Sequence, residues 1–134
     1  MRLRANQLDA ELKRNLLPIY FVTGDEPLLV QEALDSIRLA CKQQGYDERK
    51  ILDVDRKFDW QTLIEESNTL SLFSEKILTE LRLGGSKPGV PGGKVIQAYS
   101  KNLPEDRVLL ISANKVDAAT LKTKWCSEID RVGA

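Results

Sequence analysis

Four short runs with the character of strands, of which the first and the last are fully apolar, alternate with segments of helical spacing and constrain the fold of this chain more than any other feature. The runs are rich in strand-forming residues and lie at 19–22, 50–55, 77–83 and 108–111. A strand that lacks polar alternation is typical of a sheet covered on both faces. Strands that alternate with helices predict a parallel sheet with right-handed crossovers. The expected fold is therefore α/β, a three-layer parallel sheet flanked by helices.

The longest predicted helix follows the first run. Val30, Leu34, Ile37 and Cys41 are spaced i, i+4, i+7 and i+11, which places them in one apolar stripe. Gly45 is positioned to end this helix, because glycine readily adopts the left-handed conformation found just past a helix C-terminus. The stripe predicts a helix that packs one face on the sheet.

Two further helices are marked by their first residues. Asp59 is a suitable N-cap, and Phe58 and Leu63 have the spacing of a hydrophobic staple around it. A last helix is predicted over 117–129, where the same cap and staple pattern recurs. Both helices are expected to cover the sheet.

The third run and the segment after it are less regular. Residues 77–83 alternate in part between apolar and polar, which predicts a strand near the edge of the sheet. Residues 84–93 hold five of the eight glycines, so they are predicted to form a loop. A short helix is then expected over 94–101.

Composition excludes several classes of protein. The 134 residues suit one domain, and 20 basic against 20 acidic residues create no global field for nucleic acid or an anionic membrane. No apolar run approaches the ~18 residues of a membrane span, and residues 1–6 do not resemble a secretory signal. Cys41 and Cys126 have neither metal-ligand nor redox-motif spacing, and are expected to be buried thiols. A cytoplasmic location is predicted.

The chain contains no histidine. Histidine is the commonest general base and a frequent metal ligand, so Ser-His and Cys-His catalytic arrangements are excluded. Any catalysis would need carboxylates, lysines or a bound cofactor. Our expectation for this chain is no catalytic residues, no metal site and no cofactor of its own.

A phosphate-binding loop would be expected after the first strand, where the chain reads Gly24-Asp25-Glu26-Pro27. The second glycine, the lysine and the Ser/Thr of such a loop are missing. Two acidic residues instead stand at the helix N-terminus, where a phosphate would bind. Gly93-Lys94 fails the same pattern, because Val95 stands in place of Ser/Thr.

Isolated polar residues at strand ends offer weaker candidates. Asp53, Asp55 and Glu80 could be sought as magnesium ligands, but without a phosphate loop they are better explained as solvated carboxylates. Asn114 follows the fourth run, where nucleotide-binding α/β folds often place a ligand contact; turn chemistry explains it equally well.

The remaining candidate is the stretch Leu70-Ser71-Leu72-Phe73-Ser74, which follows a helical pattern and precedes the third run. Leu72 and Phe73 are adjacent, so on a regular helix or strand they cannot point the same way. Large apolar residues are most often core. An apolar pair on an exposed turn between serines can equally be an anchor for a partner's pocket.

The motifs, in their order, resemble the delta subunit of the bacterial DNA polymerase III clamp loader. The segment from Gly24 to Ala33 (GDEPLLVQEA) is similar to that family's Gly-[Asn/Asp]-[Asp/Glu]-Pro-Leu-Leu stretch and long helix. Ser71-Leu72-Phe73 resembles its clamp-binding Ser-Leu-Phe, and residues 108–115 match in place and spacing. The resemblance spans about residues 3–129.

This resemblance implies an AAA+/P-loop-NTPase-like module without a functional P-loop. Residues 1–134 are expected to be the N-terminal clamp-binding domain of a longer protein, whose helical later domains lie outside this chain. Leu72 and Phe73 would anchor the sliding clamp (beta subunit) and help open its ring, with Leu70, Ser71 and Ser74 in the same element. Other loader subunits would be partners of the full-length protein, and any DNA contact would be indirect or weak. The domain would be non-catalytic within the DNA-directed polymerase, a nucleotidyltransferase only as a complex.

Two alternatives remain open at this point. One is a doubly wound nucleotide- or phosphate-binding enzyme domain, which the missing phosphate loop disfavours. The other is that Leu72 and Phe73 belong to the core and partners bind elsewhere.

Overall fold

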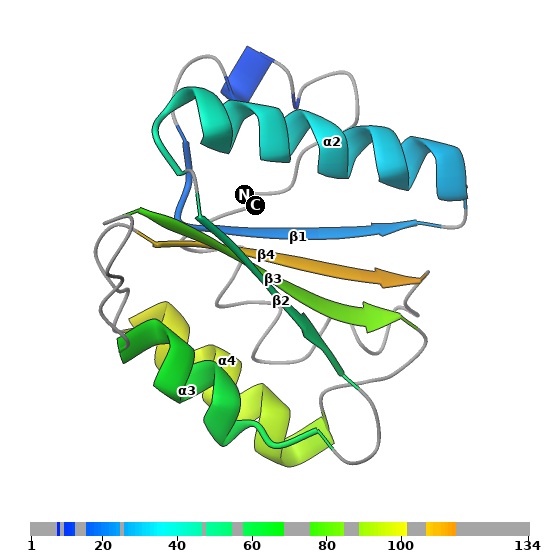
Figure 1. Ribbon diagram of the computed structural model, residues 1–134. Coiled ribbons are helices and arrows are strands. Elements are labelled where there is room, and N and C mark those ends of the chain that lie inside the picture. Colours follow the sequence, from blue (N-terminus) through cyan, green and yellow to red (C-terminus); the bar gives the residue numbers. More distant parts are fainter. Residues whose placement is uncertain are drawn as a thin grey trace.

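A computed structural model of the chain contains one sheet of four parallel strands in the order β1-β4-β3-β2 (Figure 1). The strands are β1 (Ile19–Gly24), β2 (Glu48–Asp53), β3 (Ile77–Gly84) and β4 (Arg107–Asn114). The structure describes residues 8, 10–12, 16–24, 26–46, 48–54, 58–68, 76–84, 89–101 and 107–114. All four predicted strands are confirmed, and all are parallel.

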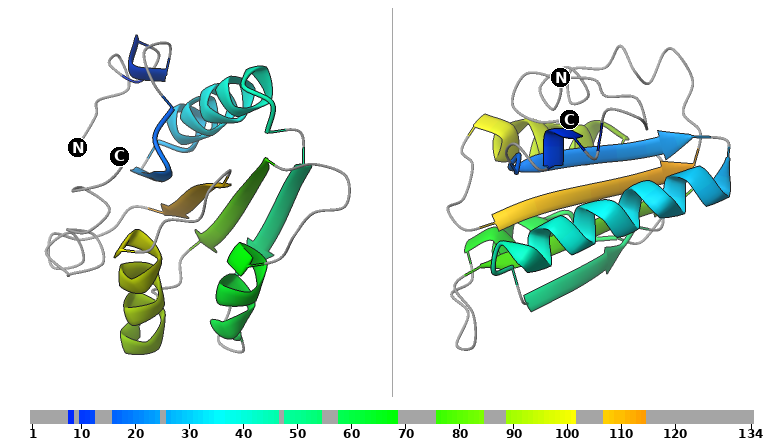
Figure 2. Two further views of the ribbon diagram at one scale, coloured as in Figure 1. Left: turned by 90° about the vertical axis from the view of Figure 1, so that its left-hand side faces the viewer. Right: turned by 90° about the horizontal axis from the view of Figure 1, so that it is seen from above.

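In the part of the chain that the structure describes, helices α2 (Pro27–Gln43), α3 (Gln61–Asn68) and α4 (Gly89–Lys101) cover the two faces of the sheet. Helix α2 lies on one face, and α3 and α4 lie together on the other (Figures 1 and 2). Each helix joins two parallel strands, so it runs antiparallel to them. The predicted three-layer α/β arrangement is confirmed. The predicted helix over 117–129 lies outside the described residues.

The stripe of α2 packs on its face of the sheet as the spacing predicted. Leu34, Ile37 and Cys41 are buried, and Val30 packs against the same apolar cluster. The sheet contributes alternate residues of three strands to this cluster; they are Tyr20, Leu78, Val108 and Leu110. Burial of the Cys41 thiol, together with the charge of Glu80, raises its pKa from 9.0 to about 12. The thiol of Cys41 is therefore a core group.

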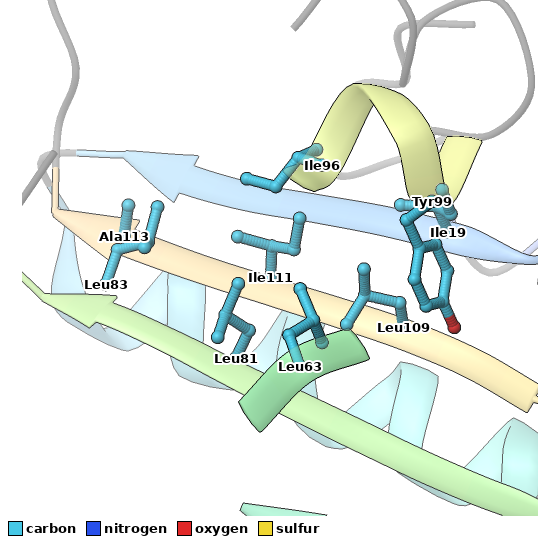
Figure 3. Close-up of a cluster of buried hydrophobic side chains, with 9 residues drawn as sticks. All are labelled: Ile19, Leu63, Leu81, Leu83, Ile96, Tyr99, Leu109, Ile111 and Ala113. Carbon is cyan, nitrogen blue, oxygen red and sulfur yellow. The ribbon is translucent and has the colours of Figure 1, made fainter. Parts of the chain in front are cut away.

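The opposite face carries the second apolar cluster, which Figure 3 shows in close-up. Leu63 of α3 and Ile96 of α4 are both buried there, with Tyr99 beside them. The strands supply the residues that point the other way from the first cluster: Ile19, Leu81, Leu83, Leu109, Ile111 and Ala113. Apolar layers on both sides of the sheet explain why the interior strand β4 reads as a continuous apolar run over 108–111.

The prediction that 77–83 lies near an edge is wrong. Strand β3 is interior, between β4 and β2, and Thr79 and Glu80 are both buried at 3% and 2% exposure. Two arginines from other elements bind the Glu80 carboxylate, which makes its burial possible. The edge strands among the described strands are β1 and β2, and the residues of β2 are exposed or half-buried.

The predicted loop over 84–93 is wrong in its second half. Helix α4 begins at Gly89, five positions before the expected start at Lys94. Pro91 is the third residue of this helix, where a missing N–H costs nothing because the first turn has no intrahelical acceptor. Gly92 and Gly93 are buried, so the absence of side chains lets this turn lie close to its surroundings.

The helix N-termini differ in how they are capped. At α3, the carboxylate of Asp59 accepts a hydrogen bond of 3.0 Å from the N–H of Gln61, so the predicted cap is confirmed. Phe58 packs edge-on against Trp60, with ring centroids 5.1 Å apart, and both join the cluster that holds Leu63. At α2, Glu26 is the N-cap residue by position, but within the described residues its side chain makes no capping bond.

Candidate functional site

The predicted clamp-binding stretch lies outside the described residues. Leu70, Ser71, Leu72, Phe73 and Ser74 belong to segment 69–75, for which the structure gives no placement. The segment joins the last residue of α3 to Lys76, which immediately precedes β3. The described residues at its two ends therefore define where it must be attached.

Both attachment points lie at the amino edge of the sheet, where the strands begin. Helix α3 starts near the carboxyl end of β2 and returns to the start of β3 (Figure 1). Helix α2 also ends at this edge, since it runs antiparallel to the strands. The described residues on either side of the stretch thus lie at the edge opposite the carboxyl edge, where open α/β sheets bind nucleotides.

The C-terminus of α2 ends in a Schellman motif at this same edge. Gly45 has φ of 93°, and its N–H donates to the carbonyl of Lys42 at 3.2 Å. The N–H of Tyr46 donates to the carbonyl of Cys41 at 3.0 Å. This pair of bonds is the Schellman pattern, and it positions the Tyr46 ring against the apolar cluster that contains Cys41.

Lys76 binds this helix end. Its ammonium donates to the carbonyl of Gln44 at 3.1 Å and lies 5.5 Å from the centroid of the Tyr46 ring. A Cβ on Gly45 would lie 3.6 Å from Cδ of Lys76, so the lysine stem runs directly over this glycine. The positive charge of Lys76 suits its position at the end of α2, because the C-terminus of a helix attracts cations.

The sequence analysis missed Lys76. Its partners lie far away along the chain, and nothing in the spacing around residue 76 indicates them. The only signal was the predicted helix end at Gly45, which is confirmed. Tyr46, the aromatic residue directly after Gly45, could have indicated that this helix end binds a cation.

A polar network crosses the sheet on the α2 side. The Glu80 carboxylate, whose side chain is 3% exposed, accepts hydrogen bonds from Arg38 of α2 at 3.0 and 2.6 Å and from Arg49 of β2. Arg38 also donates to Asp35 at 3.0 Å. Partial burial disfavours the charged form of Arg38, but its bonds to Glu80 and Asp35 outweigh this and raise the pKa of the guanidinium.

Because of this network, the interpretation of Glu80 as a solvated carboxylate is wrong. Its oxygens are occupied by two guanidinium groups, so they are not placed as metal ligands. Asp53 stays exposed and lies 3.9 Å from Arg82, while Asp55 lies outside the described residues. Among the residues that the structure describes, no group of three or more metal-ligating side chains occurs.

The carboxyl edge of the sheet is where a phosphate loop would lie. Gly24 ends β1, and a Cβ on it would come within 3.2 Å of Cγ2 of Val30, so only glycine fits without movement. The Thr23 hydroxyl donates to the carbonyl of Asn114 at 2.7 Å, which ties the ends of β1 and β4 together. Asn114 is the last residue of β4, and its backbone carbonyl is occupied by this bond.

Two leucines are exposed at the same edge. Leu28 and Leu29, in the first turn of α2, are 69% and 50% exposed. They are adjacent in sequence, like Leu72 and Phe73, and they lie at the opposite end of the strands from Lys76. None of the helices in the described part of the chain is both long and apolar enough to cross a membrane.

Fold and edges together define a three-layer parallel α/β domain in which the turn after the first strand lacks the residues of a phosphate loop. Comparison with known proteins then gives the family. The chain belongs to the DNA polymerase III delta subunit family, whose model matches residues 20–131.

Individual relatives agree with this assignment. The chain is 28% identical over 125 residues to DNA polymerase III subunit delta of Escherichia coli strain K12, a match that covers 93% of this chain and 36% of that protein. The Haemophilus influenzae DNA polymerase III subunit delta is 30% identical over 124 residues, with 92% and 36% covered. The chain thus spans about a third of the length of these relatives.

A solved structure has the same fold. The Bacillus subtilis DNA clamp loader delta protein (YqeN) superposes with a TM-score of 0.72 at 18% identity, covering 97% of this chain and 41% of that one. The chain therefore belongs to the DNA polymerase III delta subunit family by sequence, and it shares the α/β fold of this solved structure.

Proposed function

We propose that this chain is a non-catalytic domain of a clamp-loader delta subunit that binds the sliding clamp and helps to open its ring during DNA replication. The observation that carries the proposal is the family match through residues 20–131, a range that includes the stretch Leu70 to Ser74. The name of the Bacillus subtilis structure, a clamp loader delta protein, supports the same role. The other loader subunits would be partners of the full-length protein.

The stretch has the chemistry of an interface anchor. Leu72 and Phe73 offer a large apolar surface between Ser71 and Ser74, and Leu70 can extend it. Anchors of this kind fill a pocket on the partner and account for most of the binding energy. The described residues on either side of the stretch, Asn68 and Lys76, lie at the amino edge of the sheet, which is the edge opposite the nucleotide-binding edge of related folds.

Ring opening follows from unequal binding to two states of the clamp. A domain that binds the open ring more tightly than the closed ring shifts the equilibrium by that difference, and by nothing else. No hydrolysis by this domain is needed. The polymerase activity would belong to the assembled holoenzyme, to which this domain contributes a contact.

Calorimetric titration against the sliding clamp of the same organism tests the proposed anchor. If Phe73 is a central anchor, Phe73→Ala should weaken binding by about 2 kcal/mol or more, roughly 30-fold in Kd. A Leu72→Ala/Phe73→Ala variant should then lose detectable binding. Circular dichroism must show that both variants are folded.

The chain offers a matched control. Leu28→Ala/Leu29→Ala also removes an adjacent apolar pair, but from the carboxyl edge, and it should leave the clamp affinity unchanged. Equal losses in both double variants would point to non-specific apolar adhesion. A folded Leu72→Ala/Phe73→Ala variant that binds as tightly as the parent would exclude the stretch as the anchor.

Ring opening needs a separate measurement. A clamp protomer with a disrupted ring interface cannot form the closed ring. A domain that prefers the open ring should therefore bind this protomer more tightly than the intact ring. Equal affinity for the two forms would leave clamp binding in place but refute the opening role.

A further inference from the structure

We propose that the outer edge of strand β2 is an interface through which two copies of this chain pair as antiparallel strands, with a two-fold axis at Ile51. Among the described strands, β2 pairs with β3 on one side and with none on the other (Figure 2). The backbone donors and acceptors along such an edge can bind a further strand. The inference goes beyond the proposed function, because it concerns other residues and a partner other than the clamp.

The backbone groups on the outer side of β2 belong to alternate residues. The N–H of Val54 donates to the carbonyl of Arg82 at 2.9 Å, so the backbone groups of Val54 face β3. The register between β2 and β3 is unbroken along β2, so the alternation continues through the strand. Arg49, Ile51 and Asp53 therefore direct their N–H and C=O groups away from β3, toward the outer edge.

The side chains of the same three residues share one face of the sheet, because alternate residues of a strand point the same way. The side chains of Arg49 and Asp53 are 43% and 74% exposed, and Ile51 is 43% exposed. The order along the strand is thus a cation, an apolar residue and an anion. This order is self-complementary, since a second copy that runs in the opposite direction presents an anion opposite the cation.

An antiparallel pair centred on Ile51 satisfies both the backbone and the side chains. Ile51 then faces Ile51 of the second copy, and at each end Arg49 of one copy faces Asp53 of the other. All of these positions are hydrogen-bonded pairs, in which the two opposite residues exchange both N–H···O bonds. Opposite charges and apolar residues directly across from one another stabilise paired strands.

The side chains of β2 also disfavour the neighbouring registers. An axis at Arg49 or at Asp53 would place two like charges directly opposite each other. An axis at Lys50 would do the same with two ammonium groups, and an axis at Leu52 would place Asp53 opposite Ile51. The pattern of charges therefore selects the register that is centred on Ile51.

Charged residues on an edge strand can also prevent pairing, and β2 carries two cations. Lys50 lies on the opposite face of the strand from Arg49, and its ammonium is 3.3 Å from the Glu48 carboxylate, so its charge is balanced within its own chain. Arg49 binds Glu80 through Nε, and its two terminal nitrogens carry further donors for a second carboxylate. Both cations are thus compatible with the proposed pair.

Sedimentation equilibrium of the 134-residue chain tests the pairing. Two paired strands of six residues make a small interface, which belongs with weak associations of Kd on the order of 0.1 mM. Between about 10 µM and about 1 mM, the mass should rise from that of one chain toward that of two. It should rise no further, because a two-fold interface is closed.

Two variants change the edge without removing a bond to β3. Asp53→Lys places a cation opposite Arg49 at both ends, and should raise the Kd of the dimer at least about tenfold. Ile51→Pro removes an outward-facing N–H, at a position where an edge strand tolerates proline, and should abolish the dimer. Leu28→Ala/Leu29→Ala removes exposed apolar surface elsewhere, and should associate like the parent. Circular dichroism must show that the variants are folded.

Disulfide cross-linking tests the position of the axis. In a Cys126→Ser background, Ile51→Cys should give a covalent dimer with oxidised glutathione as the oxidant. The two thiols would face each other with Cα atoms about 5.5 Å apart, a distance that a disulfide can span. Leu28→Cys in the same background is the control; residue 28 is 69% exposed, so collisions alone would cross-link it at least as fast. Cys41 is buried and should not react.

The contrary outcomes are distinct. A chain that stays monomeric up to about 1 mM overturns the inference. A dimer that Asp53→Lys leaves unchanged, or that cross-links as fast through Leu28→Cys as through Ile51→Cys, overturns it too, because its interface would lie elsewhere. If Ile51→Pro does not fold, Asp53→Lys and the cross-linking comparison decide. Binding to the sliding clamp is a separate result, so the proposed function stands or falls independently.

Discussion

The network around Glu80 leads to an asymmetric prediction about stability. The Glu80 side chain is 3% exposed, whereas those of Arg38 and Arg49 are 22% and 43% exposed. If the carboxylate is removed, both arginines can turn toward water. If both arginines are removed, a buried carboxylate loses its cationic partners.

The two perturbations should therefore differ several-fold. Arg38→Met/Arg49→Met should cost about 3–5 kcal/mol of unfolding free energy, the range for a buried charge left without its partner. Glu80→Leu should cost about 2 kcal/mol or less, because an apolar residue replaces the ion and Arg38 keeps its bond to Asp35. For a chain of this size, each kcal/mol lowers Tm by about 3–5 °C.

Urea unfolding at neutral pH, followed by circular dichroism, measures these differences. Arg38→Met and Arg49→Met should each cost less than half of the double variant, since either arginine alone keeps Glu80 paired. The reasoning would be refuted by single variants that add up to the double variant. A Glu80→Leu variant less stable than the arginine pair variant would refute it as well.

Three further predictions concern single positions. Asp59→Ala removes the acceptor of the Gln61 N–H, and should lower stability by about 1 kcal/mol in urea unfolding, with Asp59→Asn nearly neutral. Gly45→Ala places a side chain at φ of 93°, and should cost about 1–2 kcal/mol in the same assay. The folded-state pKa of Cys41, about 12, lies above 9.0, so this thiol contributes stability below pH 9 that is lost as the pH rises toward 12. In a Cys126→Ser background, Cys41→Ala should flatten the pH dependence of unfolding over that window; an unchanged slope would contradict the burial of the thiol.

The hydrophobic pattern of the sequence predicted the fold class, because that pattern depends on which residues are buried by neighbouring layers. Val108 to Ile111 is apolar throughout since β4 is interior and covered on both faces, and the sequence therefore indicates a strand directly. Helix α2 is predicted equally well, because its stripe contacts one sheet face along most of its length.

The errors come from residues whose burial depends on distant partners. Glu80 looks like an exposed residue until Arg38 and Arg49 are brought to it by the fold, so its strand was misplaced at an edge. The start of α4 was missed because glycine and proline oppose helix interiors but are tolerated in a first turn.

The candidate site likewise has one part that the sequence indicates and one part that depends on residues far away along the chain. The Leu72-Phe73 motif could be found by resemblance alone, since it is a contiguous stretch, and its role as a clamp anchor stays a prediction. Lys76 could not be found from spacing, because the helix end that it binds is assembled from residues of another segment.

The order of the strands has a consequence for how the chain folds during synthesis. Strand β1 pairs only with β4 among the described strands, through contacts such as Ile19 with Leu109. Strands β2, β3 and β4 follow one another through single helices and can pair as they emerge from the ribosome, whereas β1 has no described strand to pair with until β4 is made. We therefore expect the first part of the chain to be the last to gain protection in pulsed hydrogen exchange. The apolar stripe of α2 would be the surface most in need of chaperone cover while translation proceeds.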